Sequence, residues 1–311
     1  MTTVANDEQV AASPSNRDRA RTLLSLLRPA QWFKNLVVAV PLVLVGDGWE
    51  WSRLAAVLFG VFLFTCAASA TYVVNDIADH RRDRSHPVKR GRPIASGAVG
   101  VRRAVAVAAL VYAVTAAAIA VRPMALAVPV VLYIALNLLY STVLKHVALV
   151  DVFMLASGFA LRVACGSLAV GDRPSPWLLI CVLSASLLLG LGKRRREMGD
   201  GAVADLGALL HRPALSGYSR QLIDSLVAVT GAVAVVGYVA YLSVEVTGRP
   251  VGWFTVMAST PLVMFGLARY LQVLIVGEGG GDPARTLVTD RPLLVVGALW
   301  SLCFVLPPLV A

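Results

Sequence analysis

Charged residues are scarce in this sequence. Only 15% of its residues are Asp, Glu, Lys or Arg, whereas 58% are hydrophobic. A soluble globular domain carries about 25% charged residues, so the composition excludes that class. The chain is therefore predicted to be an integral membrane protein.

Cysteine is scarce as well. The sequence contains four cysteines, and each lies inside a long apolar segment. Their spacing matches neither a disulfide framework nor a metal site. We interpret them as buried thiols, which behave as small hydrophobic side chains.

Long apolar segments are what the sequence has in abundance. A membrane-spanning helix requires roughly 20 mostly apolar residues, and Lys34 and Asn35 interrupt the first candidate. The sequence predicts an all-α, polytopic membrane bundle of nine transmembrane helices, in a single domain at residues 29–311 preceded by a disordered cytoplasmic tail at residues 1–28. The nine segments are residues 30–46, 54–75, 100–121, 123–144, 147–170, 176–192, 222–244, 251–272 and 292–311.

Basic residues outnumber acidic ones, 28 to 18, and they are distributed unevenly between the loops. With a cytoplasmic N-terminus, alternating loops put 23 of the 28 Lys and Arg residues on the cytoplasmic side. This asymmetry obeys the positive-inside rule. It predicts a multi-pass protein of the cell membrane, with its N-terminus and its chemistry in the cytoplasm and its C-terminus outside. The excess positive charge thus indicates topology and not nucleic-acid binding.

The strongest chemical signal is an acidic motif at the end of the second apolar segment. Asp76, Asp79 and Asp83 are three and four residues apart, so in a continuing helix they share one face. Carboxylates this close repel one another, and a divalent cation removes that penalty. Since Mg²⁺ binds through one or two carboxylates together with substrate phosphates, we predict that the three aspartates and Asn75 hold Mg²⁺. The alternative is a solvated helix end paired with neighbouring arginines.

Two basic segments follow the second and the sixth apolar segments. Arg side chains fit phosphate oxygens in a bidentate manner, and Lys supplies a point charge, so both segments are candidate phosphate sites. Contact with anionic lipid headgroups is the alternative for each. The first segment contributes Lys89, Arg90 and Arg92, and the second contributes Lys193, Arg194 and Glu197, with Tyr218 near its end.

Polar side chains also occur at lipid depth. Arg162 lies in the middle of the fifth apolar segment, where a charge is costly and usually faces a cavity or a partner. We predict that it binds an anion inside the cavity, and a structural ion pair with another helix is the alternative. The further candidates for this cavity or its mouth are Lys34, Asn35, Tyr72, Tyr140 and Lys145.

The NDxxDxxxD motif at residues 75–83 resembles the UbiA superfamily of intramembrane prenyltransferases. Members of that superfamily are all-helical, usually have nine spans, and bind a diphosphate substrate through Mg²⁺ on Asp-rich motifs. The resemblance covers essentially the whole chain in the number of spans and the placement of loops. It implies a membrane transferase that uses Mg²⁺.

One departure from the superfamily pattern narrows the expected activity. Members that use a prenyl diphosphate carry a second motif, roughly DxxxD, after the sixth span, whereas this chain has GKRRRE at residues 192–197, and Asp200 and Asp205 lack the DxxxD spacing. The chain resembles instead the actinobacterial branch that transfers 5-phosphoribose from phosphoribosyl diphosphate to decaprenyl phosphate, for cell-wall arabinan synthesis. The segments that carry this resemblance are RPAQWFKN, HPVKRGRPIASG, KHVALVDV and LRVACG.

The resemblance implies a division of roles. The acidic motif would hold Mg²⁺ on the leaving diphosphate, and the cations, with Lys193 as a catalytic residue, would bind the donor 5-phosphate and the acceptor phosphate. The tail of the polyprenyl phosphate would leave sideways into the lipid bilayer. Two alternatives remain, namely a prenyltransferase that moves a prenyl group from a prenyl diphosphate to an aromatic or other acceptor, and a lipid transporter or flippase. The sequence leaves the oligomeric state open, a homo-oligomer included.

Overall fold

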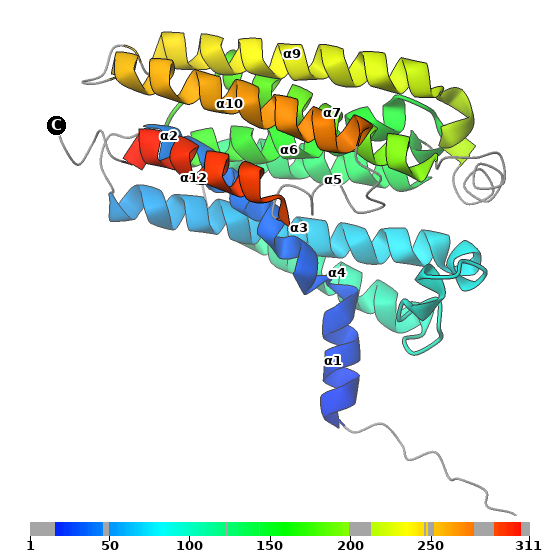
Figure 1. Cartoon of the computed structure of the whole chain (residues 1–311). Helices are drawn as coiled ribbons and strands as arrows, with labels where there is room; N and C mark the ends of the chain where they lie inside the picture. The colour runs from blue at the N-terminus through cyan, green and yellow to red at the C-terminus, as the bar shows by residue number, and fades with distance from the viewer. Residues whose placement is uncertain are drawn as a thin grey trace, which may run out of the picture.

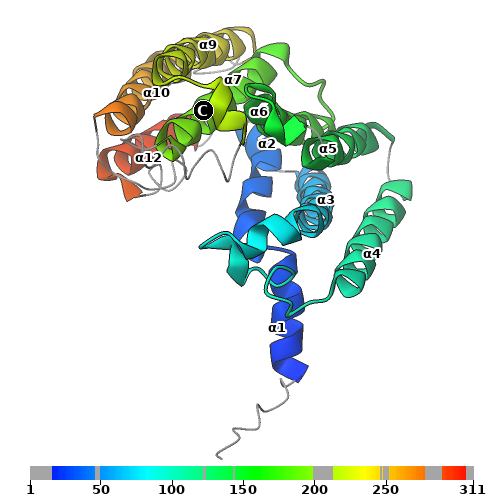
Figure 2. The same cartoon turned by 90° about the vertical axis from the view of Figure 1, so that its right-hand side faces the viewer.

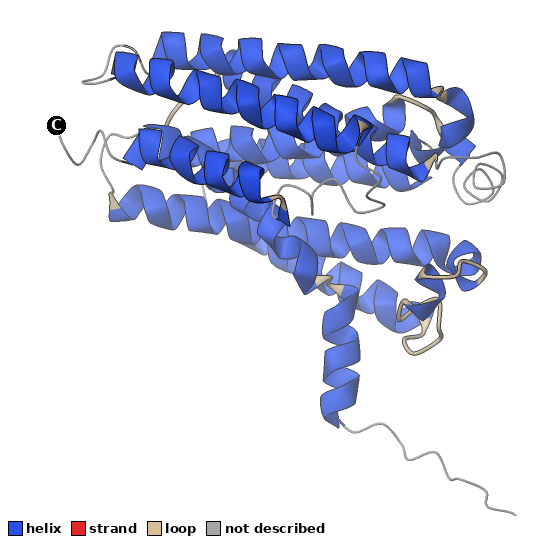
Figure 3. Cartoon of the chain, viewed as in Figure 1, coloured by secondary structure: helices blue, strands red, loops and turns tan. Residues whose placement is uncertain are grey.

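Helices make up all the regular structure in the part of the chain that is described (Figure 3). Because lipid offers no hydrogen-bond partners, a membrane-spanning chain must satisfy its backbone groups internally, as helices do. The computed structural model describes residues 16–45, 50–121, 124–142, 144–198, 213–245, 247, 252–276 and 289–305.

Seven of the nine predicted spans are confirmed as helices long and apolar enough to cross a membrane. Each begins and ends within a few residues of its predicted bounds, except that the first continues well past its apolar part into the acidic motif. The seven are α3 (Trp51–Arg84), α4 (Val101–Ala120), α5 (Met124–Thr142), α6 (Val150–Ala169), α7 (Pro176–Glu197), α9 (Arg220–Glu245) and α10 (Gly252–Ile275).

The first and the ninth predicted spans are shorter apolar helices in the described residues. The first consists of a 3₁₀ helix, η1 (Pro29–Ala39), followed by α2 (Val40–Val45). The ninth is α12 (Arg291–Val305), and residues 306–311 of the predicted span lie outside the described residues.

The long helices form an arch that encloses η1 and α2 (Figure 2). Packing contacts join α3 to α4 and α5, α6 to α5 and α7, α7 to α9, and α10 to α12. The C-terminal ends of α3 and α7 lie at the same end of the bundle, on the right in Figure 1. The acidic motif and the second basic segment are therefore carried at the same end of the bundle.

The first apolar segment makes a close crossing with α6. A Cβ atom on Gly166 would lie 2.0 Å from the carbonyl oxygen of Val38, so only glycine permits the approach. Arg28, directly before η1, has a left-handed backbone with φ 51°, which turns the chain before Pro29. The crossing carries Asn35 into the interior, where it is 1% exposed.

A helix also forms where the sequence analysis expected a disordered tail. The helix α1 spans Asn16–Leu26 and stands across the direction of the long helices (Figure 1). Leu26 is fully buried in a cluster with Val73, Ile94 and Val99. Burial of that side chain anchors the end of α1 beside α3. Residues 1–15 of the expected tail lie outside the described residues.

Candidate active site

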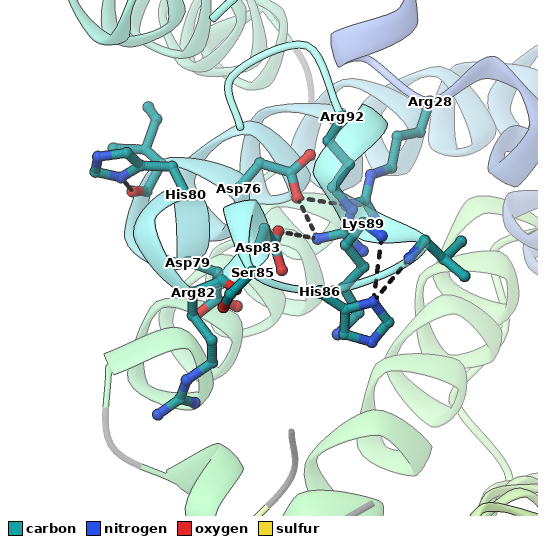
Figure 4. Close-up of polar contacts among 12 residues, drawn as sticks. Arg28, Asp76, Asp79, His80, Arg82, Asp83, Ser85, His86, Lys89 and Arg92 are labelled. Carbon is teal, nitrogen blue, oxygen red and sulfur yellow. Dashed lines mark hydrogen bonds and ion pairs between the residues drawn. The ribbon is translucent and has the colours of Figure 1, made fainter. Parts of the chain in front are cut away.

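The acidic motif lies on the last turns of α3, which continues without a break to Arg84. Asp76 and Asp83 are seven residues apart, close to two helical turns, and therefore lie nearly in line along the helix. Both are 3% exposed. Arg92 Nη1 donates to Asp76 Oδ1 at 2.9 Å and to Asp83 Oδ2 at 2.7 Å (Figure 4). The two carboxylates thus converge on one cationic nitrogen.

Asp79 is not brought together with the other two aspartates, although all three were predicted to share one metal site. It is turned about 60° from Asp76 around the helix axis, and its Oδ1 accepts from Lys145 Nζ at 2.5 Å. Lys145 belongs to the short connection between α5 and α6. Among the described residues, no three Asp, Glu, His or Cys side chains gather as a metal cluster.

The acidic motif is nevertheless suited to bind a Mg²⁺ ion that is also coordinated by the substrate. Mg²⁺ binds through one or two protein carboxylates and completes its octahedral shell with water and phosphate oxygens, and Asp76 and Asp83 already converge on one point. Asn75 adds a second observation. Its Oδ1 is buried and has no hydrogen-bond partner in the part of the chain that is described, and such orphaned groups usually have a functional reason. Asn75 precedes Asp79 by one helical turn, so a ligand could contact both.

Arg28 is a site residue that the sequence analysis did not single out. Its Nη2 donates to Asp76 Oδ1 at 2.5 Å, and its guanidinium carbon lies 5.0 Å from the centre of the Tyr72 ring. The contact joins residues 48 positions apart in the chain. The only local signal was an arginine directly before Pro29, at the start of the RPAQWFKN segment.

The first basic segment folds back over the acidic motif. Arg84 Nε donates to the carbonyl oxygen of Ala95 at 3.2 Å, and the His86 ring accepts from the backbone N–H of Lys89 at 3.3 Å. These contacts hold the turn that places Arg92 on the aspartates. Arg90 is exposed. The segment therefore contributes one cation to the motif and presents another to solvent.

Positive charge is concentrated beside Asp79. The pKa of His146, next to Lys145, is lowered by burial first and then by the charges of Lys145 and Arg82. Lys145 and Arg82 thus lie close enough to His146 to disfavour its charged form, whereas Asp79 favours it. This end of the molecule is thus suited to bind anions, and phosphates in particular.

Arg162 is enclosed within the bundle by aromatic rings. Its guanidinium carbon lies 4.7 Å from the centre of the Tyr133 ring and 5.2 Å from that of Phe64, and its Nε donates to Asn35 Oδ1 at 2.9 Å. No carboxylate pairs with it among the described residues, where the sequence analysis had offered an ion pair as one alternative. Cation–π contacts and the Asn35 carbonyl offset the cost of the buried charge.

A second buried network joins α6, α7 and the segment before α9. Arg194, 1% exposed in its side chain, pairs through Nε with Asp151 Oδ2 at 3.1 Å and also contacts Glu197. Tyr218 donates to Asp151 Oδ1 at 2.7 Å and accepts from the backbone N–H of Leu149 at 2.7 Å. Burial, together with the hydrogen bond to Asp151, raises the pKa of Tyr218, so the phenol stays protonated as a donor. Three predicted substrate contacts are thereby engaged with protein groups.

Lys193 differs from its neighbour Arg194 in its exposure to solvent and in its contacts. It is exposed, and the described part of the chain gives it neither an ion pair nor a hydrogen bond. Arg195, next along the helix, pairs with Asp224 at 2.5 Å. One helical step of 100° thus separates a buried structural cation from one available to a ligand.

Four positions considered in the sequence analysis are less informative. Tyr140 is half-buried. Lys34 is also half-buried. Asp200 and Asp205 lie outside the described residues.

Comparison with known proteins adds to this geometry. A model of the UbiA prenyltransferase family matches residues 36–273. The chain is 32% identical over 319 residues to the decaprenyl-phosphate phosphoribosyltransferase of Corynebacterium glutamicum, covering 98% of this chain and 91% of that protein. It is 31% identical over 301 residues to the enzyme of the same name from Mycobacterium tuberculosis strain H37Rv, covering 95% and 96%.

Solved structures support the fold. A UbiA homolog from Archaeoglobus fulgidus bound to DMAPP and Mg²⁺ superimposes with a TM-score of 0.69 at 18% identity, covering 93% of this chain and all of that one (100%). The same homolog bound to GPP and Mg²⁺ gives a TM-score of 0.68 at 17% identity, with coverages of 93% and 98%. At these identities the likeness establishes the arrangement of helices.

Proposed function

The chain belongs to the UbiA prenyltransferase family, and we propose that it transfers a 5-phosphoribosyl group from phosphoribosyl diphosphate to a polyprenyl phosphate such as decaprenyl phosphate, releasing diphosphate. The observation that carries this proposal is the end of α7. An exposed Lys193 occurs there, followed by three arginines, where relatives that use prenyl diphosphates are expected to carry a second Asp-rich motif. The near full-length similarity to two decaprenyl-phosphate phosphoribosyltransferases supports it.

The substrates explain why one acidic motif is surrounded by so many cations. The donor carries a diphosphate on C1 and a phosphate on C5, and the acceptor carries a further phosphate. Arg28, Arg92 and Lys145 lie on the motif itself, and Lys193 lies across the arch on α7. We assign the donor diphosphate to the α3 side and the acceptor phosphate to Lys193. The exposed Arg90, with Lys89 beside it, is assigned to the donor 5-phosphate.

Mg²⁺ fits this scheme as the cofactor. Asp76 and Asp83, with Asn75, would hold it, and it would neutralise the charge that develops on the leaving diphosphate. Two fold neighbours were solved with Mg²⁺ and a prenyl diphosphate. Arg92, which contacts both carboxylates, would then be available to a phosphate oxygen.

The reaction itself needs little from the protein beyond positioning and charge. The C1–O bond of the donor breaks with its electron pair going to the diphosphate, and an oxygen of the acceptor phosphate bonds to C1. That oxygen is already anionic, so no side chain has to remove a proton. Lys145 and Arg28 stabilise the departing charge in a site from which water is partly excluded, and Lys193 orients the attacking phosphate.

The network of Arg194, Glu197 and Tyr218 is assigned a positioning role. Arg194, Glu197 and Tyr218 position the end of α7 relative to the connection that carries Lys145, and they are assigned here as positioning residues. Asn35, Tyr72 and Arg162 are assigned to the inner wall of the proposed substrate cavity, where Arg162 would contribute a positive potential. Tyr140 and Lys34 remain candidates for the cavity and its mouth.

The membrane arrangement follows the same proposal. The two shorter apolar helices complete nine spans together with the seven confirmed ones. The positive-inside asymmetry places the N-terminus and the active site in the cytoplasm and the C-terminus outside, in the plasma membrane. The product would serve as a precursor of cell-wall arabinan.

A transfer assay tests the proposed function directly. Protein purified in detergent is incubated with radiolabelled phosphoribosyl diphosphate, decaprenyl phosphate and Mg²⁺, and the organic phase is examined for labelled lipid. We expect labelled lipid with Mg²⁺ and none with EDTA. Turnover of a prenyl diphosphate with an aromatic acceptor, in the absence of labelled lipid, would replace the proposal with the prenyltransferase alternative.

Replacement of Lys193 by alanine is expected to raise the KM for the acceptor. Loss of a hydrogen bond to a charged group corresponds to a change of about 10- to 100-fold, with the KM for phosphoribosyl diphosphate little altered. Lys193→Arg should restore much of the affinity because the charge is kept. Arg103→Ala, which removes an exposed cation at the start of α4, is the matched control. Unchanged constants for both substrates in Lys193→Ala would remove this residue from the site.

A further inference from the structure

A lateral groove lies between α7, α9, α10 and α12, away from the acidic motif. It has a volume of about 490 Å³, and its lining is formed by leucine, valine, alanine and glycine with three aromatic side chains and one cysteine. Along α10 the lining runs from Leu262 to Tyr270, which corresponds to about 12 Å of helix. The groove is thus long, narrow and apolar, which suits a hydrocarbon chain and not a nucleotide or sugar.

One end of the groove reaches the proposed phosphate site. Tyr270 lines this end and is 3% exposed. A Cβ on Gly192 would lie 2.5 Å from the Tyr270 hydroxyl oxygen, so Tyr270 packs directly on the backbone of α7. Gly192 immediately precedes Lys193. Leu189 of α7 also lines the groove, and Lys193 follows it by one helical turn on nearly the same side of the helix. The polar end of a chain in the groove therefore lies about one turn of α7 from Lys193.

The other end is closed by hydrogen-bonded side chains. Trp300 Nε1 donates to the Tyr238 hydroxyl at 2.8 Å, and Tyr238 donates to Ser259 Oγ at 2.6 Å. These contacts join α12, α9 and α10. A chain longer than the groove cannot continue along the bundle axis and has to turn outward into the bilayer.

Glycines make the room for the groove. Gly231 of α9, Gly266 of α10 and Gly297 of α12 all line it. A Cβ on Gly297 would meet nothing within 4 Å, and one on Gly266 would meet only the Val296 side chain at 3.6 Å. Larger residues would fit at these two positions and would fill the groove. The glycines are therefore not needed for close packing of the helices, and they leave the groove open.

We propose that this groove binds the isoprene units nearest the phosphate of the lipid acceptor, a site that rests on the proposed function and extends it. Its apolar length matches the tail, its open side lets the remainder enter the bilayer, and Lys193, one turn of α7 beyond Leu189 of the lining, matches the phosphate. Lipid is as apolar as the groove, so the tail gains no hydrophobic energy by entering. The tail is stabilised in the groove by close packing. The groove thereby aligns the phosphate of the acceptor and favours acceptors whose tail fits it.

Gly297→Leu tests the groove because leucine fills it without a backbone clash. Gly297 lies past the first residues of α12, so we expect a short acceptor, dimethylallyl phosphate, to react as in the unaltered protein. For decaprenyl phosphate we expect kcat/KM to fall by about tenfold or more, since the chain loses its close packing in the groove and its phosphate is no longer aligned. Ala298→Leu is the matched control, because Ala298 is the next residue, is exposed and does not line the groove.

A second variant and a labelling experiment complete the test. Ala234→Leu, on the opposite wall in α9, should give the same selective loss if Gly297→Leu fails to fold. A polyprenyl phosphate carrying a diazirine on its second isoprene unit should label groove residues such as Leu262 and Val296, as located by mass spectrometry. Equal activity of Gly297→Leu and Ala298→Leu toward decaprenyl phosphate, or labelling confined to helices other than these four, overturns the groove. Failure of the unaltered protein to modify any prenyl phosphate overturns the proposed function instead.

Discussion

Asp76→Asn is expected to abolish phosphoribosyl transfer while the protein stays folded. Asp76 is 3% exposed and accepts hydrogen bonds from both Arg28 and Arg92, so its charge is the central anion of the motif. Asparagine keeps the shape but neither attracts Mg²⁺ nor holds the two guanidinium groups. Loss of preorganised electrostatic stabilisation at one position typically costs about 10²- to 10³-fold in kcat, and loss of the metal adds to it.

The fold is expected to survive because the arginines are partly solvated. The side chains of Arg28 and Arg92 are 26% and 27% exposed, so water can screen them once Asp76 is neutral. Thermal unfolding in detergent should therefore show a small change beside the loss of transfer. Asp172→Asn, at an exposed position in the connection between α6 and α7, is the matched control and should retain activity. Full activity of Asp76→Asn would contradict the metal assignment.

Binding of Mn²⁺ gives a readout that does not depend on turnover. Mn²⁺ is a paramagnetic substitute for Mg²⁺, and its bound fraction can be measured by electron paramagnetic resonance in the presence of diphosphate. We expect Asp76→Asn and Asp83→Asn to weaken Mn²⁺ binding strongly. Asp79→Asn should affect transfer more than metal binding, because Asp79 contacts Lys145 and not the shared nitrogen of Arg92.

Among the substitutions proposed here, Asp151→Ala is expected to lower the free energy of unfolding most. Asp151 and Arg194 are 0% and 1% exposed in their side chains, and removal of one partner of a buried pair costs about 3–5 kcal/mol. Arg194 would then keep Glu197, whose side chain is 27% exposed and compensates the buried charge less well. The free energy of unfolding can be measured by denaturant titration in mixed micelles. The substitution also removes the acceptor of Tyr218, which holds the backbone at Leu149.

The neighbouring pair provides the contrast. Arg195 and Asp224 lie closer together, at 2.5 Å, but their side chains are 20% and 37% exposed. Asp224→Ala should therefore cost only about 0–1 kcal/mol, as exposed pairs do. In the double variant Asp151→Ala, Arg194→Met, much of the lost stability should return, because no buried charge is left unpaired; Glu197, which loses Arg194, is 27% exposed and can be solvated. Equal losses for Asp151→Ala and Asp224→Ala would show that burial does not set the strength of these pairs.

Much of the fold could be predicted because it depends on local properties of the chain. Apolar length predicts a span whatever lies beside it, and seven such helices were confirmed. The spacing of Asp76 and Asp83 places them in line on any helix. The helix at Asn16–Leu26 was not predicted, because its attachment depends on the burial of Leu26 against residues that are distant in sequence.

The candidate site likewise has features set by local sequence and features set by tertiary packing. By itself the sequence determined the membrane class, the acidic motif on α3 and the basic end of α7, since each is set by composition or helical spacing. Only the tertiary structure decided that Arg28 reaches Asp76, that Arg162 lies among aromatic rings, and that Arg194 is buried while Lys193 is exposed. The physical reason is that helix rotation and packing choose the partner of each charge, and adjacent residues on a helix point 100° apart.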